Sequence, residues 1–309
     1  LSSSSAASDV YKRQEYFFHS QAHNVLLFNG QAQPQEQQYK GSMLDGSLHH
    51  LTDEGNIKYI LANVTGPTSR YFSKNHRSFL WIDDVILVID DVCSHEDGTF
   101  SLLFHPDGVS RKNGIDLSVV NQQAAVDIRP LWPDYLTESD FEHDFPYNLK
   151  LKAHQGPKAK KTDEMETYYS VTYPIKAQSV KFITAIILKD SPASKNIPQV
   201  TRLKGDDLQG VRIAKGDKIT DVYLNTRADG HIMHRNSCTN VNGWDTDAYL
   251  LAFSYKKGTD PAVSKNILEW FIGYGSYVRN AHESIFDSYT KKYKVCLLYT
   301  SPSPRDPKT

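Results

Sequence analysis

Apolar and polar residues alternate with a period of two over short stretches from one end of the chain to the other. These stretches are rich in Val, Ile, Tyr and Phe, which favour strands, whereas the three- and four-residue spacing of an amphipathic helix is scarce. The pattern therefore predicts an all-β chain. The predicted strands are Asn24–Phe28, Ile57–Ala62, Arg77–Trp81, Val85–Asp90, Thr99–Phe104, Ala125–Arg129, Thr167–Tyr173, Lys181–Leu188, Asp221–Asn225, Tyr249–Tyr255 and Leu268–Gly273.

Turn dipeptides separate these strands. The clearest hairpin joins Arg77–Trp81 to Val85–Asp90 through Asp83-Asp84. Eleven or more strands indicate a large two-sheet antiparallel β-sandwich. The other predicted turns lie at Asn29-Gly30, Asp45-Gly46, Asp97-Gly98, Asp107-Gly108, Asn113-Gly114, Asp229-Gly230 and Asn242-Gly243.

One segment stands out for its charge. Five lysines fall between Lys150 and Lys161, together with Gly156-Pro157. A run of like charge with turn residues predicts an exposed, solvated loop, and contact with an acidic polymer is the alternative interpretation of the same lysines.

The two ends of the chain share a feature at the level of DNA. Residues Asp9 to Gln14 can be encoded by gatgtgtataagagacag, and its reverse complement, started at the second base, encodes Cys296 to Ser301. One element in opposite orientations resembles the transposon end used to prepare sequencing libraries, and Pro302 to Asp306 continue into its adaptor. We therefore expect residues 1–14 and 296–309 to be translated artefact and residues 15–295 to be the authentic domain.

Composition excludes several classes of protein. Without the two flanks the chain has 31 basic and 34 acidic residues, and this balance gives no support to nucleic-acid binding. The longest apolar stretch, Phe182 to Leu188, is far shorter than the roughly 20 residues of a membrane-spanning helix. The segment 15–295 keeps two of the three cysteines, Cys93 and Cys238, which are too few for a disulfide scaffold.

Histidines are concentrated in the first eighty residues of the authentic segment, where His19, His49 and His50 accompany two that stand at strand starts. His23 precedes one predicted strand and His76 opens the best hairpin, with Asp45 between them. Two histidines and an aspartate suit zinc, so the three side chains could meet at the rim of a sheet. Ordinary surface histidines are the alternative, because ligands this far apart in sequence have no distinctive spacing.

The order of several motifs resembles one known family. His23-Asn24-Val25-Leu26-Leu27-Phe28-Asn29-Gly30-Gln31-Ala32-Gln33 is similar to the most specific signature of the heparinase II/III-like polysaccharide lyases. The resemblance spans almost all of residues 15–295 and corresponds to the C-terminal, supersandwich-like β-domain of that family. The further matching segments are Tyr39–Asp45, Tyr59–Thr65, His76–Trp81, Val88–Asp90, Trp244–Ala248 and Gly275–Arg279.

The resemblance implies a function and a metal. It implies β-elimination of a uronic-acid-containing polysaccharide, like heparin, heparan sulfate or alginate, in the bacterial periplasm or cell envelope. It also implies a structural zinc held by His23, Asp45 and His76, with His105 as an alternative ligand. Most of the catalytic apparatus belongs to an N-terminal α/α-toroid domain that this sequence does not include, so we expect the segment to be inactive alone.

The resemblance also implies candidate residues for the cleft. Some members carry a catalytic histidine where this chain has Gln21, so we take His19 and Tyr59 as the candidate catalytic residues. Arg77 and Gln21 are the candidate substrate-binding residues, because a guanidinium can hold a carboxylate or sulfate with two hydrogen bonds. Arg77 could equally pair with Asp83 or Asp84, and Tyr59 could be a packing residue of its strand. The rival function is a non-catalytic carbohydrate-binding or structural sandwich derived from a degenerate lyase, and Gln21 favours it.

Overall fold

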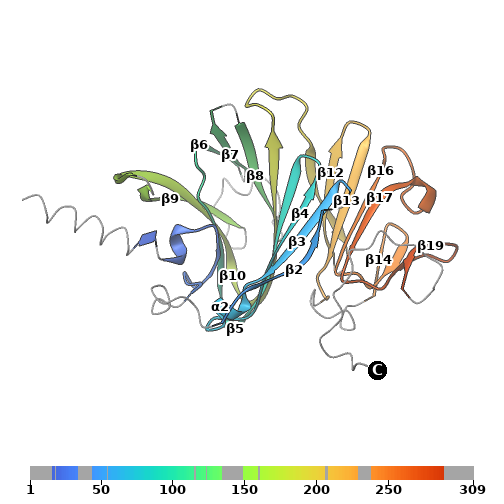
Figure 1. Ribbon diagram of the computed structural model, residues 1–309, viewed down its shortest axis with the longest axis horizontal. Coiled ribbons are helices and arrows are strands. Elements are labelled where there is room, and N and C mark those ends of the chain that lie inside the picture. Colours follow the sequence, from blue (N-terminus) through green and yellow to red (C-terminus); the bar gives the residue numbers. More distant parts are fainter. Residues whose placement is uncertain are drawn as a thin grey trace, which may run out of the picture. The chain divides into compact units, whose positions relative to one another are not determined.

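The computed structural model describes residues 16–17, 19–33, 44–53, 55–114, 116–122, 124–133, 149–158, 161–205, 208–228 and 238–288. Both segments predicted to be artefact, and the predicted turn at Asp229-Gly230, lie outside these residues. The described part is antiparallel β-structure with only short helical segments, so the predicted all-β sandwich class is confirmed (Figure 1). No helix within these ranges is long and apolar enough to cross a membrane.

The first sheet contains ten strands in the order β2-β3-β4-β5-β10-β8-β7-β6, with β1 added to β5 and β9 added to β10. Its strands and the two short helices near its start are η1 (Ser20–Ala22), β1 (Leu26–Phe28), β2 (Ser47–Thr52), β3 (Ile57–Asn63), α2 (Thr65–Thr68), β4 (Phe72–Ile82), β5 (Val85–Phe104), β6 (Val109–Asn113), β7 (Asp116–Asn121), β8 (Ala124–Trp132), β9 (Lys150–Lys158) and β10 (Lys161–Lys189).

The other two sheets follow in sequence. The five-stranded sheet has the order β11-β12-β13-β16-β17, and the four-stranded sheet has the order β14-β15-β18-β19, so the described chain has one sheet more than the two predicted. Their elements are β11 (Gln199–Gly205), β12 (Leu208–Lys215), β13 (Lys218–Asn225), β14 (Thr239–Val241), β15 (Trp244–Thr246), β16 (Leu250–Lys256), η5 (Ser264–Asn266), β17 (Ile267–Gly273), β18 (Tyr277–Arg279) and β19 (Ser284–Asp287).

The chain divides into two compact units. Unit 1 combines the described residues up to His49 with Ile60–Leu80 and Ile86–Ser194, and unit 2 combines His50–Tyr59, Trp81–Val85 and the described residues from Lys195 onward. In unit 2 the five- and four-stranded sheets share one core, in which Trp244 of β15 packs against Phe253 of β16 with ring centroids 6.5 Å apart.

The core of unit 1 comes from one face of the ten-stranded sheet. β10 supplies Tyr169 and Val171 from its first half and Val180 and Phe182 from its second half to the same cluster. Because both halves of one strand reach the same core, the sheet curls around it, as large twisted sheets do. β1 adds Leu26 and Phe28, while Leu27 between them faces the other side.

Two local predictions were wrong. The predicted turn at Asp97-Gly98 lies inside β5, which runs unbroken to Phe104. A Cβ on Gly98 would come within 2.2 Å of the Phe28 ring, so this glycine permits close packing across the strands. The predicted loop Lys150–Lys161 contains strand β9, which pairs along its length with β10. β9 is an edge strand, and an edge strand tolerates Pro157 because its unpaired side needs no N–H donor.

Candidate functional site

The segment that carries the sequence motif is fixed to unit 1 by hydrogen bonds. The Asn24 carbonyl accepts a hydrogen bond from Arg77 Nη1 at 2.6 Å, and its side-chain Oδ1 accepts one from the His105 backbone at 2.7 Å. The ring of His105 in turn contacts the Gln21 carbonyl through Nε2 at 2.9 Å. β4 and the end of β5 therefore hold the segment from Gln21 to Asn24 in one place.

Arg77 pairs with a residue other than those expected. Its Nε donates to Asp90 Oδ1 at 2.6 Å, and Asp90 is 1% exposed on the neighbouring strand β5. Burial raises the pKa of Asp90, and the charge and hydrogen bond of Arg77 oppose that rise. The predicted alternative partners, Asp83 and Asp84, instead form ion pairs with Lys218 and Lys215 in unit 2.

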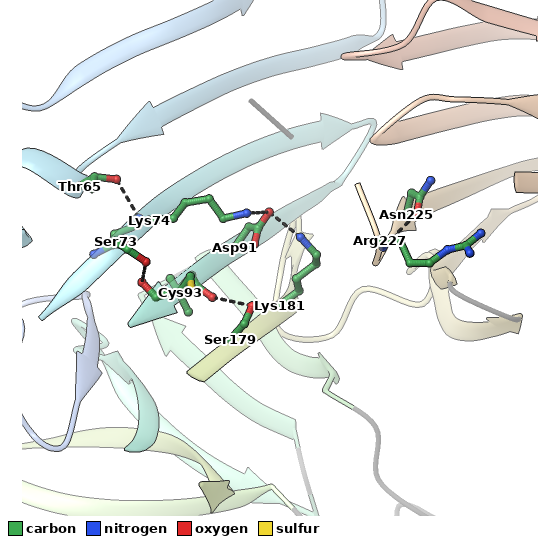
Figure 2. Close-up of polar contacts among 11 residues, drawn as sticks. Thr65, Ser73, Lys74, Asp91, Cys93, Ser179, Lys181, Asn225 and Arg227 are labelled. Atoms are coloured by element: carbon green, nitrogen blue, oxygen red, sulfur yellow. Dashed lines mark hydrogen bonds and ion pairs between the residues drawn. The ribbon is translucent and has the colours of Figure 1, made fainter. Parts of the chain in front are cut away.

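The next residue of β5, Asp91, points to the opposite face of the sheet. Its Oδ2 accepts hydrogen bonds from Lys181 at 2.6 Å and from Lys74 at 2.8 Å, as Figure 2 shows. Burial by itself would raise the pKa of Asp91, but the charges of Lys181 and Lys74 lower it. Consecutive aspartates on β5 thus have opposite pKa shifts because their cationic partners differ in number.

The three predicted zinc ligands are not assembled. His23 and Asp45 are exposed, whereas His76 is buried at 4% exposure. His23 Nε2 contacts the Phe17 carbonyl at 2.9 Å, which leaves only Nδ1 for a metal. Within the described ranges no three His, Cys, Asp or Glu side chains lie close enough to hold a metal ion. The side chains of His23, Asp45 and His76 therefore do not form a zinc site in this arrangement, and including His105 does not complete one.

The two candidate catalytic residues lie in different units. His19 is half-buried and precedes η1, where its carbonyl accepts a hydrogen bond from the Ala22 amide at 3.0 Å. Tyr59 belongs to unit 2 and is 2% exposed, with its ring centroid 5.0 Å from that of Phe271. This environment favours the packing interpretation of Tyr59.

The structure also shows a groove lined mostly by polar side chains, of which only Gln21 and the lysines of the segment Lys150–Lys161 stand out in the sequence. It has a volume of about 370 Å³ and lies in unit 1 on the face of the sheet opposite the core. Because side chains alternate between the two faces of a strand, every second residue over a stretch of β9 and of β10 lines the groove. In the register of these strands, His154 of β9 pairs with Tyr168 of β10. The residues that line it are Gln21, Leu27, Ser101, Leu103, Lys150, Lys152, His154, Tyr168, Ser170 and Thr172.

Ring stacking and a hydrogen bond to a hydroxyl hold the side chains of this groove in place. The Tyr168 ring stacks on His105 with centroids 4.7 Å apart and on His154 with centroids 5.0 Å apart. His154 Nε2 also contacts the Ser170 hydroxyl at 2.8 Å. These contacts fix the side chains before any ligand arrives.

The charge of the groove is positive. Lys150 and Lys152 line it, and no carboxylate is among its lining residues. Burial lowers the pKa of His154, and the charge of Lys152 lowers it further. Burial also lowers the pKa of His105. Because both imidazoles favour the neutral form, the two lysines supply the charge, and the groove suits an anionic ligand with hydroxyl groups.

The comparisons with known proteins concern the fold. No protein-family model matches this chain, and no curated protein matches it in sequence. A heparan sulfate lyase mutant from Pedobacter heparinus matches with a TM-score of 0.50 and 11% identity over 70% of this chain and 32% of that chain. A heparinase III matches with a TM-score of 0.51 and 14% identity, again over 70% of this chain and 32% of that chain. The chain has a heparinase III-like fold.

This heparinase III-like fold confirms, for the architecture, the resemblance carried by the motif from His23 to Gln33. A further heparinase III structure agrees, with a TM-score of 0.50 and 12% identity over 68% of this chain and 30% of that chain. The chain spans about a third of the length of these solved structures.

Proposed function

We propose that this chain is the β-sandwich portion of a bacterial polysaccharide lyase and that its groove binds a uronic-acid-containing polysaccharide. The observation that carries the proposal is the row of Lys150, Lys152 and His154 on β9, which faces the hydroxyls of Ser170 and Thr172 on β10. Successive acidic units of a glycan chain can meet successive side chains of such a row. Charge-assisted hydrogen bonds from the lysines supply the affinity.

The lyase reaction is β-elimination. A base removes the proton at carbon 5 of the uronate, the carboxylate is neutralised, and an acid protonates the leaving oxygen. In this proposal the lysines hold the acidic groups, and His19 stays the candidate for proton transfer, since Tyr59 is enclosed in unit 2. The remaining machinery belongs to a helical domain of the same protein, and the location is the periplasm or cell envelope.

One observation favours a second function. Gln21 lines the groove where some lyases carry a catalytic histidine, and an amide can bind a sugar without transferring a proton. The alternative is therefore a non-catalytic module that binds the same acidic polysaccharide.

Titration of the chain with heparan sulfate and alginate oligosaccharides tests the proposal. We expect binding that weakens with salt, and Lys152→Gln should weaken it about tenfold because a charge-assisted hydrogen bond is lost. Lys176→Gln is the matched control, since Lys176 is an exposed lysine of β10 outside the groove. If the two substitutions weakened binding equally, the groove would not be the binding site.

A second experiment separates lyase from binding module. The chain joined to the helical domain of a heparinase III should release unsaturated uronide, detected by its ultraviolet absorbance. Binding without product in that fusion would support the non-catalytic module.

A further inference from the structure

A second cavity, of about 290 Å³, lies in unit 1 on the core face of the sheet. Leu102 and Ile128 belong to both the cavity lining and the core cluster, so the cavity is where that core opens at one end. Its walls are mainly apolar, and Phe79 of β4 stands at 38% exposure among them. A ligand that enters must therefore present an apolar face.

The lining also contains five polar side chains: Asn24 and His105, and three from neighbouring strands. Arg77 and Asp90 form the ion pair already described, and Thr184 comes from β10. Asp90 and Thr184 are each 1% exposed, and within the described part of the chain Asp90 Oδ2 and Thr184 Oγ1 have no hydrogen-bond partner. Buried polar atoms are nearly always paired, so two such atoms in the lining of one cavity point to a partner from outside the protein.

The charges of the cavity balance. Arg77 carries the positive charge and Asp90 the negative one, and Arg77 Nε lies 2.6 Å from Asp90 Oδ1. A charged ligand would face one opposite and one like charge here, so an uncharged ligand with hydroxyl groups is favoured.

We propose that this cavity binds the ring of a neutral pyranose sugar. Such a ring has an apolar face of C–H groups, which packs on Phe79 and Phe104, and an edge of hydroxyls, which reach Asp90 and Thr184. The proposal goes beyond the lyase function and does not rest on it, because the lysines of the groove take no part.

Saturation-transfer NMR on the full chain tests this, with glucose, galactose and mannose as probes and glucuronate as the charged comparison. We expect at least one neutral sugar to bind and glucuronate to bind more weakly. Thr184→Val should weaken the binding of the sugar about tenfold, because the hydroxyl that meets the sugar is lost. It should not lower the melting temperature, because valine keeps the shape of threonine and removes an unpaired hydroxyl.

A matched variant separates binding from stability. Thr220 in unit 2 is also 1% exposed, but its hydroxyl is 2.8 Å from that of Ser254. Thr220→Val should lower the melting temperature and leave sugar affinity unchanged. Phe79→Ala should weaken the binding of the sugar. Trp81→Ala should leave it unchanged, because Trp81 is an exposed aromatic residue outside the cavity lining. Three outcomes would each overturn the proposal: no binding of any neutral sugar, wild-type affinity in Thr184→Val, or equal affinity for glucuronate.

Discussion

Lys181 donates a hydrogen bond to Asp91 across 2.6 Å, and both side chains are at most 9% exposed. Lys74 donates to the same Oδ2 atom from the other neighbouring strand, so three adjacent strands meet at one carboxylate (Figure 2). Removing one member of a buried ion pair leaves the other charge unpaired, which costs far more than breaking a pair at the surface. The carboxylate of Asp91 is therefore a point on which the stability of this sheet depends.

We predict that Asp91→Asn lowers the free energy of unfolding by about 3 kcal/mol at pH 7. The lysines lower the folded-state pKa of Asp91 below its unfolded value. The stabilisation is therefore present above the unfolded pKa of about 4 and is lost as pH falls through the folded pKa. Urea unfolding from pH 7 down to pH 2 should show wild type and variant converging at the acidic end.

The control for this experiment is Asp83→Asn. Asp83 pairs with Lys218 at the surface, where both side chains are about a third exposed, and its positive φ of 49° suits asparagine. Asp83→Asn should therefore lower the free energy of unfolding by at most about 1 kcal/mol. A similar loss in both variants at pH 7 would contradict the assigned role of Asp91.

The hairpin between β4 and β5 shows what local sequence can predict. Asp83 takes the left-handed conformation expected of its turn, and β4 alternates between buried and more exposed residues from Arg77 to Ile82, whereas β5 is buried on both faces from Leu87 to Asp90. Gly98 shows where that reasoning failed, since the ring of Phe28, seventy residues earlier, explains this glycine better than a turn does. β9 was mistaken for a loop because its lysines alternate with Leu151 and Ala153, and charge hid the period of two.

The site was harder to predict than the fold for a related reason. Its groove combines Ser101, Lys152 and Tyr168 from three strands, and only the register of those strands brings them to one face. Arg77 was predicted to bind substrate or to pair with Asp83 or Asp84, whereas its observed partner Asp90 depends on the pairing of β4 with β5. Sequence spacing predicts neither relationship.

We predict that His154 titrates below the usual range for histidine. Burial and the neighbouring charge of Lys152 both disfavour the imidazolium form in the folded chain. Because the folded-state pKa is lowered, the neutral form is favoured by folding, and stability falls as pH drops through the unfolded pKa of about 6.5.

NMR titration of the histidine ring protons checks this prediction. Lys152→Gln should raise the pKa of His154, because a positive charge is removed, whereas Lys176→Gln should leave it unchanged. A midpoint for His154 at or above that of an unstructured peptide would contradict the buried, stacked position of the ring.

We predict that Tyr59 acts through packing. Its ring is 2% exposed and packs against Phe271, so Tyr59→Ala should cost about 3 kcal/mol in the free energy of unfolding. Tyr59→Phe keeps the ring and should cost less than about 1.5 kcal/mol. In the fusion with a helical domain, Tyr59→Phe should retain product formation, and a complete loss with an intact fold would restore Tyr59 as a catalytic residue.

The last prediction concerns His23 and zinc. His23 Nε2 contacts the Phe17 carbonyl at 2.9 Å, and the described histidines and carboxylates form no group of three. We therefore expect His23→Ala to leave the metal content of the purified chain unchanged and to cost about 1 kcal/mol through the lost hydrogen bond. Mass spectrometry of metal content decides the matter, with His76→Ala measured beside it. Near-stoichiometric zinc that disappears in both variants would mean that His23 releases Phe17 and that the ligands rearrange around the ion, as the motif predicts.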